Sequence, residues 1–336
     1  MPEFLPGLEL SRAFYEEVVR EILGDMPHSA ARLGWGSDVL GFDTERSTDH
    51  GWGPQLQVFV EEPFDIDSRL PEMFRGWPVR YGWDDKPVEH HVDVTSLGRW
   101  VEQHLGFDPR VGMETRDWLT TPQQLLLGFT AGAVFHDGLG ELEPLRAKLE
   151  WYPHDVWLWL IACQWGRIDQ EEPFVGRTAE VGDELGSRIL AARLVWDLMR
   201  LCFLLERRYA PYSKWVGSAF ATLEAAAEVG PQLERAIAAT GLRAREEALV
   251  EAVEAVARRH NALGVTEPQE PSVRLFYTRP FRVLGSRRFV DACLARVEDE
   301  WLRSLPLAGS IDQWADSTDV LSDGALARRL ATRLEP

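Results

Sequence analysis

The chain has 336 residues, 45% of them hydrophobic, and a formal net charge of −18 at pH 7. That length suggests about two domains, with enough apolar side chains for packed cores. A protein that binds nucleic-acid phosphates or an anionic membrane needs a basic surface. The acidic balance therefore argues against duplex nucleic acid and membrane surfaces as partners.

The three cysteines, Cys163, Cys202 and Cys293, lie far apart in apolar segments and show no CxxC spacing. This excludes a zinc knuckle and a disulfide framework, and we expect all three thiols to be buried. The N-terminal residues lack the basic start and apolar run of a signal peptide, and no run of about 18 apolar residues predicts a membrane span. A cytoplasmic protein is therefore expected.

The first third of the chain mixes helix and strand patterns. Apolar residues at helical spacing predict a helix over 8–24, which Gly24 ends. Strands are predicted over 31–35, 55–61 and 88–95, with a short helix over 66–74. This mixture predicts a small mixed α/β domain over residues 1–115.

From residue 116 onward the pattern is helical, with few strand signals. The predicted helices cover 123–135, 142–149, 155–165, 183–209, 213–228, 244–263 and 289–305. We therefore expect an α+β protein with a larger all-helical domain over residues 116–336. Most of the fourteen Trp are expected to pack cores, and the Trp-rich helices leave a homodimer open as an alternative.

The segment from residue 34 to 57 carries the most informative pattern, GWGSDVLGFDTERSTDHGWGPQLQ. A Gly36-Ser37 pair follows a predicted strand, and Asp49 follows at the expected start of the next strand. Such a pattern is typical of nucleotidyltransferases. The small turn lets backbone N–H groups and a hydroxyl approach a triphosphate, and acidic residues beyond it hold Mg2+.

The second carboxylate of that pattern is missing. Two carboxylates spaced two residues apart on a strand share a face, but here the spacing gives Asp49 and Gly51. A third acid is expected from the strand over 88–95, where Asp93 shares a face with Glu89 and His91. Asp49 and Asp93 are thus the predicted metal ligands and catalytic residues. Restoring Asp at position 51 is expected to increase divalent-metal affinity.

Beyond this pattern, long blocks of the chain resemble a bacterial nucleotidyltransferase-like family, domain of unknown function 4037. The blocks run over nearly the whole length: GSDVLGFDTERSTDHGWGP, TAGAVFHD, YPHDVWLWL, EEPFVGRTAEVGDELGSR, YAPYSKWVGSAF, HNALGVT and GSIDQWADSTDV. In that family the strand motif reads Asp-His-Asp-Trp-Gly, so Gly51 departs from it. The departure puts catalysis in doubt and leaves the fold as expected.

The resemblance implies an N-terminal nucleotidyltransferase-like domain that transfers a nucleoside monophosphate from ATP or another nucleoside triphosphate with Mg2+. The acceptor, a small molecule or a protein, is not specified. In related two-domain transferases the helical part supplies cations for the triphosphate, which makes Arg177, Arg188 and Lys214 candidate phosphate contacts beside Gly36 and Ser37. The competing interpretation of Arg188 is a surface helix pair with Glu184.

Three classes of function stay open. The first is a working or weakly working transferase, and the second is a nucleotide-binding or protein-interaction module that Gly51 has left without turnover. The third is a member of a toxin–antitoxin-like pair. A zinc site at His90 and His91 is disfavoured because alternation sends these two side chains to opposite faces. No Walker A, GxGxxG or GxSxG motif is present.

Overall fold

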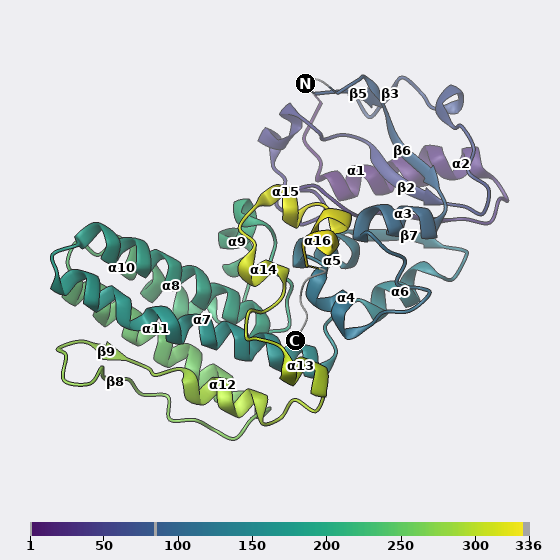
Figure 1. The fold of residues 1–336 in the computed structure, drawn as a ribbon. Coiled ribbons are helices and arrows are strands. Elements are labelled where there is room, and N and C mark those ends of the chain that lie inside the picture. Colours follow the sequence, from purple (N-terminus) through teal and green to yellow (C-terminus); the bar gives the residue numbers. More distant parts are fainter. Residues whose placement is uncertain (1, 84–85, 332–336) are drawn as a thin grey trace. The chain divides into compact units, whose positions relative to one another are not determined.

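The computed structural model describes residues 2–83 and 86–331 and divides them into two compact units. Unit 1 contains the described residues up to 114 together with 121–150 and 319–330, and unit 2 contains residues 115–120, 151–318 and 331. Unit 1 holds a small mixed sheet, whereas unit 2 is helical apart from a short hairpin (Figure 1). The chain is therefore α+β, as expected.

Unit 1 is built on a five-stranded sheet with the order β5-β6-β2-β1-β7. Its strands are β1 (Ser29–Arg32), β2 (Gln55–Phe59), β5 (Arg80–Tyr81), β6 (Glu89–Thr95) and β7 (Ala133–Asp137). β2 and β6 pair in parallel, and the other neighbours pair antiparallel. The predicted strand over 88–95 is confirmed as β6.

Helices cover both faces of this sheet, and alternation along the strands decides which side chain meets which helix. On one face, Leu56, Val58 and Val92 join a buried cluster with the first helical segment. That segment comprises α1 (Gly7–Phe14), a π-helical turn (Tyr15–Val19) and α2 (Arg20–Leu23), and Gly24 ends it as expected. On the opposite face, Phe59 of β2 contacts Trp100 of α3 (Leu97–Leu105) with ring centroids 5.8 Å apart.

Two expected elements of unit 1 are wrong. The segment 66–74 forms only a 3-10 turn (Asp67–Arg69) and β3 (Met73–Phe74), which pairs with β4 (Trp77–Pro78). The helix expected over 123–135 ends early, as α5 (Gln123–Thr130). Gly132, at φ +68°, turns the chain so that β7 pairs with the free edge of β1. α6 (Leu142–Lys148) follows β7.

Unit 2 is a group of helices in which α7 and α8 pack along each other, as do α10 and α11 (Figure 1). Its helices are α4 (Thr115–Thr120), α7 (His154–Glu180), α8 (Glu184–Leu205), α9 (Ser213–Phe220), α10 (Ala226–Ala238), α11 (Leu242–Ala262), α12 (Arg287–Leu294), α13 (Glu300–Ser304) and α14 (Ile311–Trp314). The last two described helices, α15 (Thr318–Leu321) and α16 (Gly324–Ala331), belong mainly to unit 1. β8 (Arg274–Leu275) and β9 (Arg282–Val283) form the hairpin.

The core of unit 2 contains tryptophan and cysteine side chains that the sequence predicts to be buried. Trp157, Trp159 and Trp165 of α7 are fully buried, which confirms the expected packing role for these Trp. All three cysteines are buried and free, also as expected. Among residues 2–83 and 86–331, no helix combines the length and the apolar character needed to cross a lipid bilayer.

Candidate functional site

The Gly36-Ser37 turn is organised around a buried ion pair. Arg32, the last residue of β1, donates from Nε to Asp38 Oδ2 at 2.7 Å and from Nη2 to Asp38 Oδ1 at 3.0 Å. Its remaining donors reach the carbonyl oxygens of Leu33 at 2.7 Å and Trp35 at 2.6 Å. One guanidinium thus binds both ends of the turn, which fixes the path of residues 33–38.

Gly36 is required by this ion pair as well as by its backbone conformation. Its φ is +140°, and a Cβ added there would lie 2.0 Å from Asp38 Oδ1 and 2.6 Å from Arg32 Nη2. The glycine is therefore explained by close packing inside the protein. Ser37 is half-buried, and its carbonyl oxygen accepts from the N–H of Phe42 at 2.8 Å.

Strand β2 presents amides where a metal-dependent transferase would present carboxylates. Gln55 and Gln57, two residues apart, point to the face of the sheet opposite the α1 cluster. Gln57 Oε1 accepts from the N–H of Leu33 at 2.9 Å, and Gln55 Nε2 makes a longer contact of 3.4 Å with Asp38 Oδ2. These two amides connect the sheet to the turn, and neither carries the charge that Mg2+ prefers in its ligands.

Asp93 lies beside these amides on the neighbouring strand. In the parallel register it is opposite Gln57, while His91 is opposite Gln55. The Asp93 side chain is exposed, yet desolvation by the surrounding protein raises the pKa of its carboxyl group, and Arg99 and His90 lower it in partial compensation. The expected alternation of β6 is observed, since Val92 packs into the α1 cluster.

The expected strand position of Asp49 is wrong. Asp49 ends a 3-10 turn (Glu45–Asp49), is exposed, and pairs with His50 Nδ1 at 2.6 Å, whereas β2 begins only at Gln55. Gly51 has a left-handed φ of +60°, which is incompatible with a continuous strand running from Asp49 to Gln55. Spacing along a strand therefore does not relate positions 49 and 51. A Cβ at Gly51 would instead point to the Trp83 ring, at 3.8 Å.

Aromatic side chains stand beside the Gly51–Gly53 segment. The rings of Tyr81 and His91 have centroids 4.1 Å apart, and Trp83 lies 5.5 Å from His91. His91 Nε2 donates to the Tyr81 carbonyl oxygen at 2.9 Å, which fixes the tautomer of the ring. Burial raises the pKa of the Tyr81 hydroxyl, and no hydrogen-bond partner for it lies among the described residues. The cluster offers flat faces and one unused polar atom.

The donors that the structure describes are not gathered into a two-metal centre. Within residues 2–83 and 86–331, no group of three or more His, Cys, Asp or Glu side chains is arranged to hold a metal ion. Asp38 is committed to Arg32, and Asp49 to His50. The predicted Mg2+ ligands Asp49 and Asp93 thus come from an exposed turn and from a strand, and their roles stay predictions.

The three cations predicted to contact phosphate all lie in unit 2 with local partners. Arg177 stacks over the Phe174 ring, and Lys214 lies over the Trp215 ring. Arg188 donates to Glu184 Oε1 at 3.0 Å and to the Thr240 carbonyl oxygen at 3.1 Å. The helix pair between Arg188 and Glu184, the competing interpretation, is therefore present.

Two of these cations are separated along the chain by most of α8. Arg188 lies in the second turn of α8, whereas Lys214 follows the far end of that helix, at the start of α9. At 1.5 Å per residue, the 17 residues from Arg188 to the end of α8 span about 25 Å.

Four residues of the turn and sheet were missed from the sequence: Arg32, Asp38, Gln55 and Gln57. One signal was available, because a charged residue at the end of a strand as short and apolar as Ser29–Arg32 needs a partner nearby. Asp38, six residues on and next to Ser37, was the nearest acid after it.

Comparisons with known proteins agree with the resemblance expected from the sequence. Residues 118–216 match the family model described as domain of unknown function (DUF4037). No curated protein matches the chain. A crystal structure of a nucleotidyltransferase-like protein from Exiguobacterium sibiricum matches with 14% identity over 88% of this chain and 91% of that chain, with a TM-score of 0.30. The family match thus supports the resemblance to domain of unknown function 4037 over residues 118–216, and nothing is transferred from the structural match.

Proposed function

We propose that this nucleotidyltransferase-like chain binds a nucleotide at the sheet of unit 1 without turning it over by metal-dependent transfer. One observation carries the proposal. The two β2 positions beside Asp93, where paired carboxylates would hold metal, are Gln55 and Gln57. Loss of ligands from a two-metal site removes most of the charge stabilisation on which phosphoryl transfer depends.

The same region has suitable chemistry for a nucleotide that carries no tightly held metal. The Gly36-Ser37 turn supplies backbone N–H groups and a hydroxyl. Trp83 and His91 offer ring faces on which a base can stack, and Gln55 provides an amide that both donates and accepts.

A second candidate is an Mg2+-dependent transferase that moves a nucleoside monophosphate from ATP or another nucleoside triphosphate to a small molecule or protein. Asp93 favours it, because β6 is separated from β1, which leads into the turn, by the single strand β2. For this candidate, bound Mg2+ would neutralise charge on the phosphates. Asp93, with Asp49, would hold it, and Gly36 and Ser37 would position the triphosphate.

Calorimetric titration of ATP into the full chain, with Mg2+ and with EDTA, distinguishes the candidates. The binding proposal expects ATP affinities within about threefold in the two conditions and unchanged in the Asp49→Ala Asp93→Ala double variant. Binding that requires Mg2+ and disappears in the double variant would instead establish the transferase. No binding in either condition would leave unit 1 as a protein-interaction module.

A further inference from the structure

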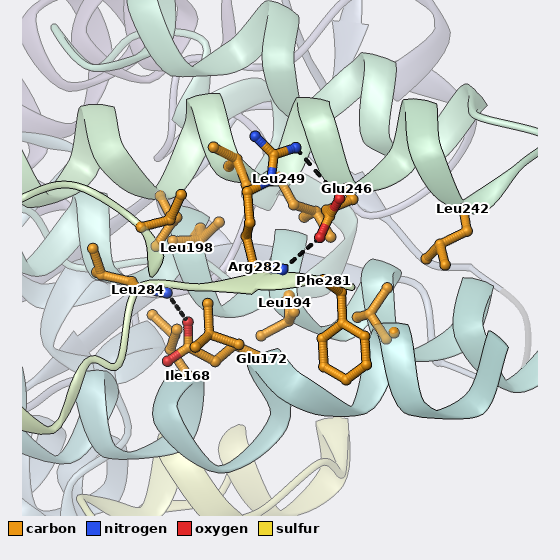
Figure 2. A pocket seen from close by; sticks show the side chains of 16 residues that line it. Ile168, Glu172, Leu194, Leu198, Leu242, Glu246, Leu249, Phe281, Arg282 and Leu284 are labelled. Carbon is orange, nitrogen blue, oxygen red and sulfur yellow. Dashed lines mark hydrogen bonds and ion pairs between the residues drawn. The ribbon is translucent and has the colours of Figure 1, made fainter. Parts of the chain in front are cut away.

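Unit 2 contains a partly open apolar cavity of about 40 Å³ lined by α7, α8 and α11 (Figure 2). Its apolar lining includes Ile168, Leu194, Leu198, Leu249, Phe281 and Leu284. Two carboxylates, Glu172 of α7 and Glu246 of α11, also line it, and both reach the same chain segment, residues 281–286, here called the strap. The strap contains β9 and forms one wall of the cavity.

Glu172 holds the C-terminal half of the strap by its backbone. Its carboxyl oxygens accept from the N–H groups of Leu284 at 2.6 Å, Gly285 at 2.8 Å and Ser286 at 3.1 Å. One side chain therefore satisfies three successive donors that precede α12. Without it these buried or half-buried N–H groups would lose their partners, which disfavours the closed position.

Glu246 holds the other half of the strap. Its Oε1 accepts from the N–H of Arg282 at 2.5 Å, and its Oε2 lies 3.3 Å from Nη2 of the same residue. Next to Arg282, the Phe281 ring packs directly on α7, where the absent side chain of Gly176 leaves room for it. The strap is thus attached at both ends by glutamates and seated by one aromatic ring.

A second, larger pocket lies on the other side of the strap. It has a volume of about 500 Å³ and is lined by exposed residues of the hairpin, including Arg274 and Tyr277. Glu172 and Val283 line both spaces, so the strap is the wall that separates them. Movement of this wall would join the apolar cavity to the larger pocket.

We propose that the strap is a lid, latched by Glu172 and Glu246, over a binding site for a small apolar molecule. The closed cavity is smaller than the roughly 150 Å³ that holds a benzene-sized ligand in a dry protein interior. Occupation therefore requires the strap to move. The ligand needs no polar group, because Glu246 is paired with Arg282 and Glu172 is bound to the N–H groups of the strap.

The latch responds to pH through Glu172. Burial raises the pKa of Glu172 to about 7, and Asp169 on the same helix adds to this, while the three N–H donors act against it. The charge of Arg288 on α12 also interacts with that of Glu172. Of the other charged groups near the strap, Arg274 lines the larger pocket, and Glu246 and Arg282 line the apolar cavity. In an open strap the carboxyl is solvated and its pKa returns to the ordinary value, so rising pH favours opening.

Hydrogen exchange at the amides of residues 284–286, measured on the full chain and corrected for intrinsic rates, tests the latch. We expect the wild-type amides to open about tenfold more often at pH 8 than at pH 6. Glu172→Gln should remove this difference. Glu172→Ala should raise the exchange rate at least tenfold at both pH values, and should tighten binding of the neutral apolar dye N-phenyl-1-naphthylamine at least tenfold.

Glu180→Gln is the matched control, because Glu180 pairs with Arg279 of the same hairpin on the surface and should change exchange and dye binding by less than threefold. Exchange in Glu172→Ala within threefold of wild type would overturn the latch, and faster exchange without dye binding would overturn the apolar site. If Glu172→Ala does not fold, the pH arm decides: equal opening at pH 6 and pH 8 in the wild type refutes the proposal.

Discussion

Arg32 and Asp38 form a bidentate ion pair in which the two side chains are only 5% and 2% exposed. Removal of one member leaves an uncompensated buried charge, which costs about 3–5 kcal/mol. We therefore expect Asp38→Ala to lower the free energy of unfolding by that amount in urea titrations. Glu17→Ala, which breaks the exposed pair with Arg75, should cost less than about 1 kcal/mol. Equal effects of the two variants would contradict the assigned role of the ion pair.

The register of β2 and β6 predicts where a metal site can be rebuilt. Gln57→Asp would place a carboxylate opposite Asp93, about 4.8 Å away across the strand pair. We expect this variant to bind Mn2+ at least tenfold more tightly than the wild type at pH 7, by calorimetry. The Gln57→Asp Asp93→Asn variant should lose the gain.

Gly51→Asp is the contrasting substitution. In the family that the sequence resembles, this position is Asp, and spacing along a strand predicts that Asp here increases metal affinity. The structure instead turns the new side chain toward Trp83. We expect Mn2+ affinity within threefold of wild type and a loss of stability near 1 kcal/mol from the left-handed φ. A tenfold gain would place Asp49 and residue 51 together at a metal site.

His260 predicts acid sensitivity in unit 2. Burial lowers its pKa to about 4, and its Nδ1 accepts from Trp165 Nε1 at 3.1 Å. The folded pKa is below the unfolded value, so stability is present above about pH 6.5 and is lost as pH falls toward 4. On the order of 3 kcal/mol is expected over that window. His260→Asn, which does not titrate, should flatten the pH dependence of urea unfolding between pH 7 and 5.

Two glycines of α7 provide a paired test of packing. A Cβ at Gly176 would lie 2.4 Å from the Phe281 ring, whereas at Gly166 the nearest contact would be 4.0 Å. We expect Gly176→Ala to cost about 1–3 kcal/mol, since Phe281 has to move. Gly166→Ala should be neutral or stabilise by up to about 1 kcal/mol, through helix propensity. Thermal unfolding of both variants measures the difference, and a stabilising Gly176→Ala would mean that Phe281 is not seated there.

Local patterns predicted the elements whose signals are contained within a few residues. The alternation from Glu89 to Thr95 predicted β6 and the faces of its side chains, and Gly24 predicted the end of the first helical segment. β7 was read as helix because its apolar residues continue those of α5. Only pairing with β1, about a hundred residues earlier in the chain, makes it a strand.

The candidate site was harder to predict because its contacts depend on turns. The spacing of Asp49 and Gly51 is compatible with a strand, but the sequence does not predict the left-handed conformation of Gly51 that rules the strand out. Glu172 stood in a polar block of the sequence, yet its partners are backbone N–H groups 112–114 residues away. Every residue except proline has a backbone N–H group, so the sequence does not indicate which of these groups a glutamate binds. The latch could therefore be identified only from the structure.

Unit 1 is assembled from segments that lie far apart in the sequence, which affects its folding during synthesis. β7 completes its sheet, and residues 319–330 belong to the same unit, while most of unit 2 lies between them in the sequence. During synthesis the ribosome therefore releases the helices of unit 2 before the last piece of unit 1. A fragment truncated at residue 115 would expose the edge of β1 that β7 normally covers, and such an edge recruits other chains. Residues 1–115 alone therefore lack the strand that covers this edge of unit 1.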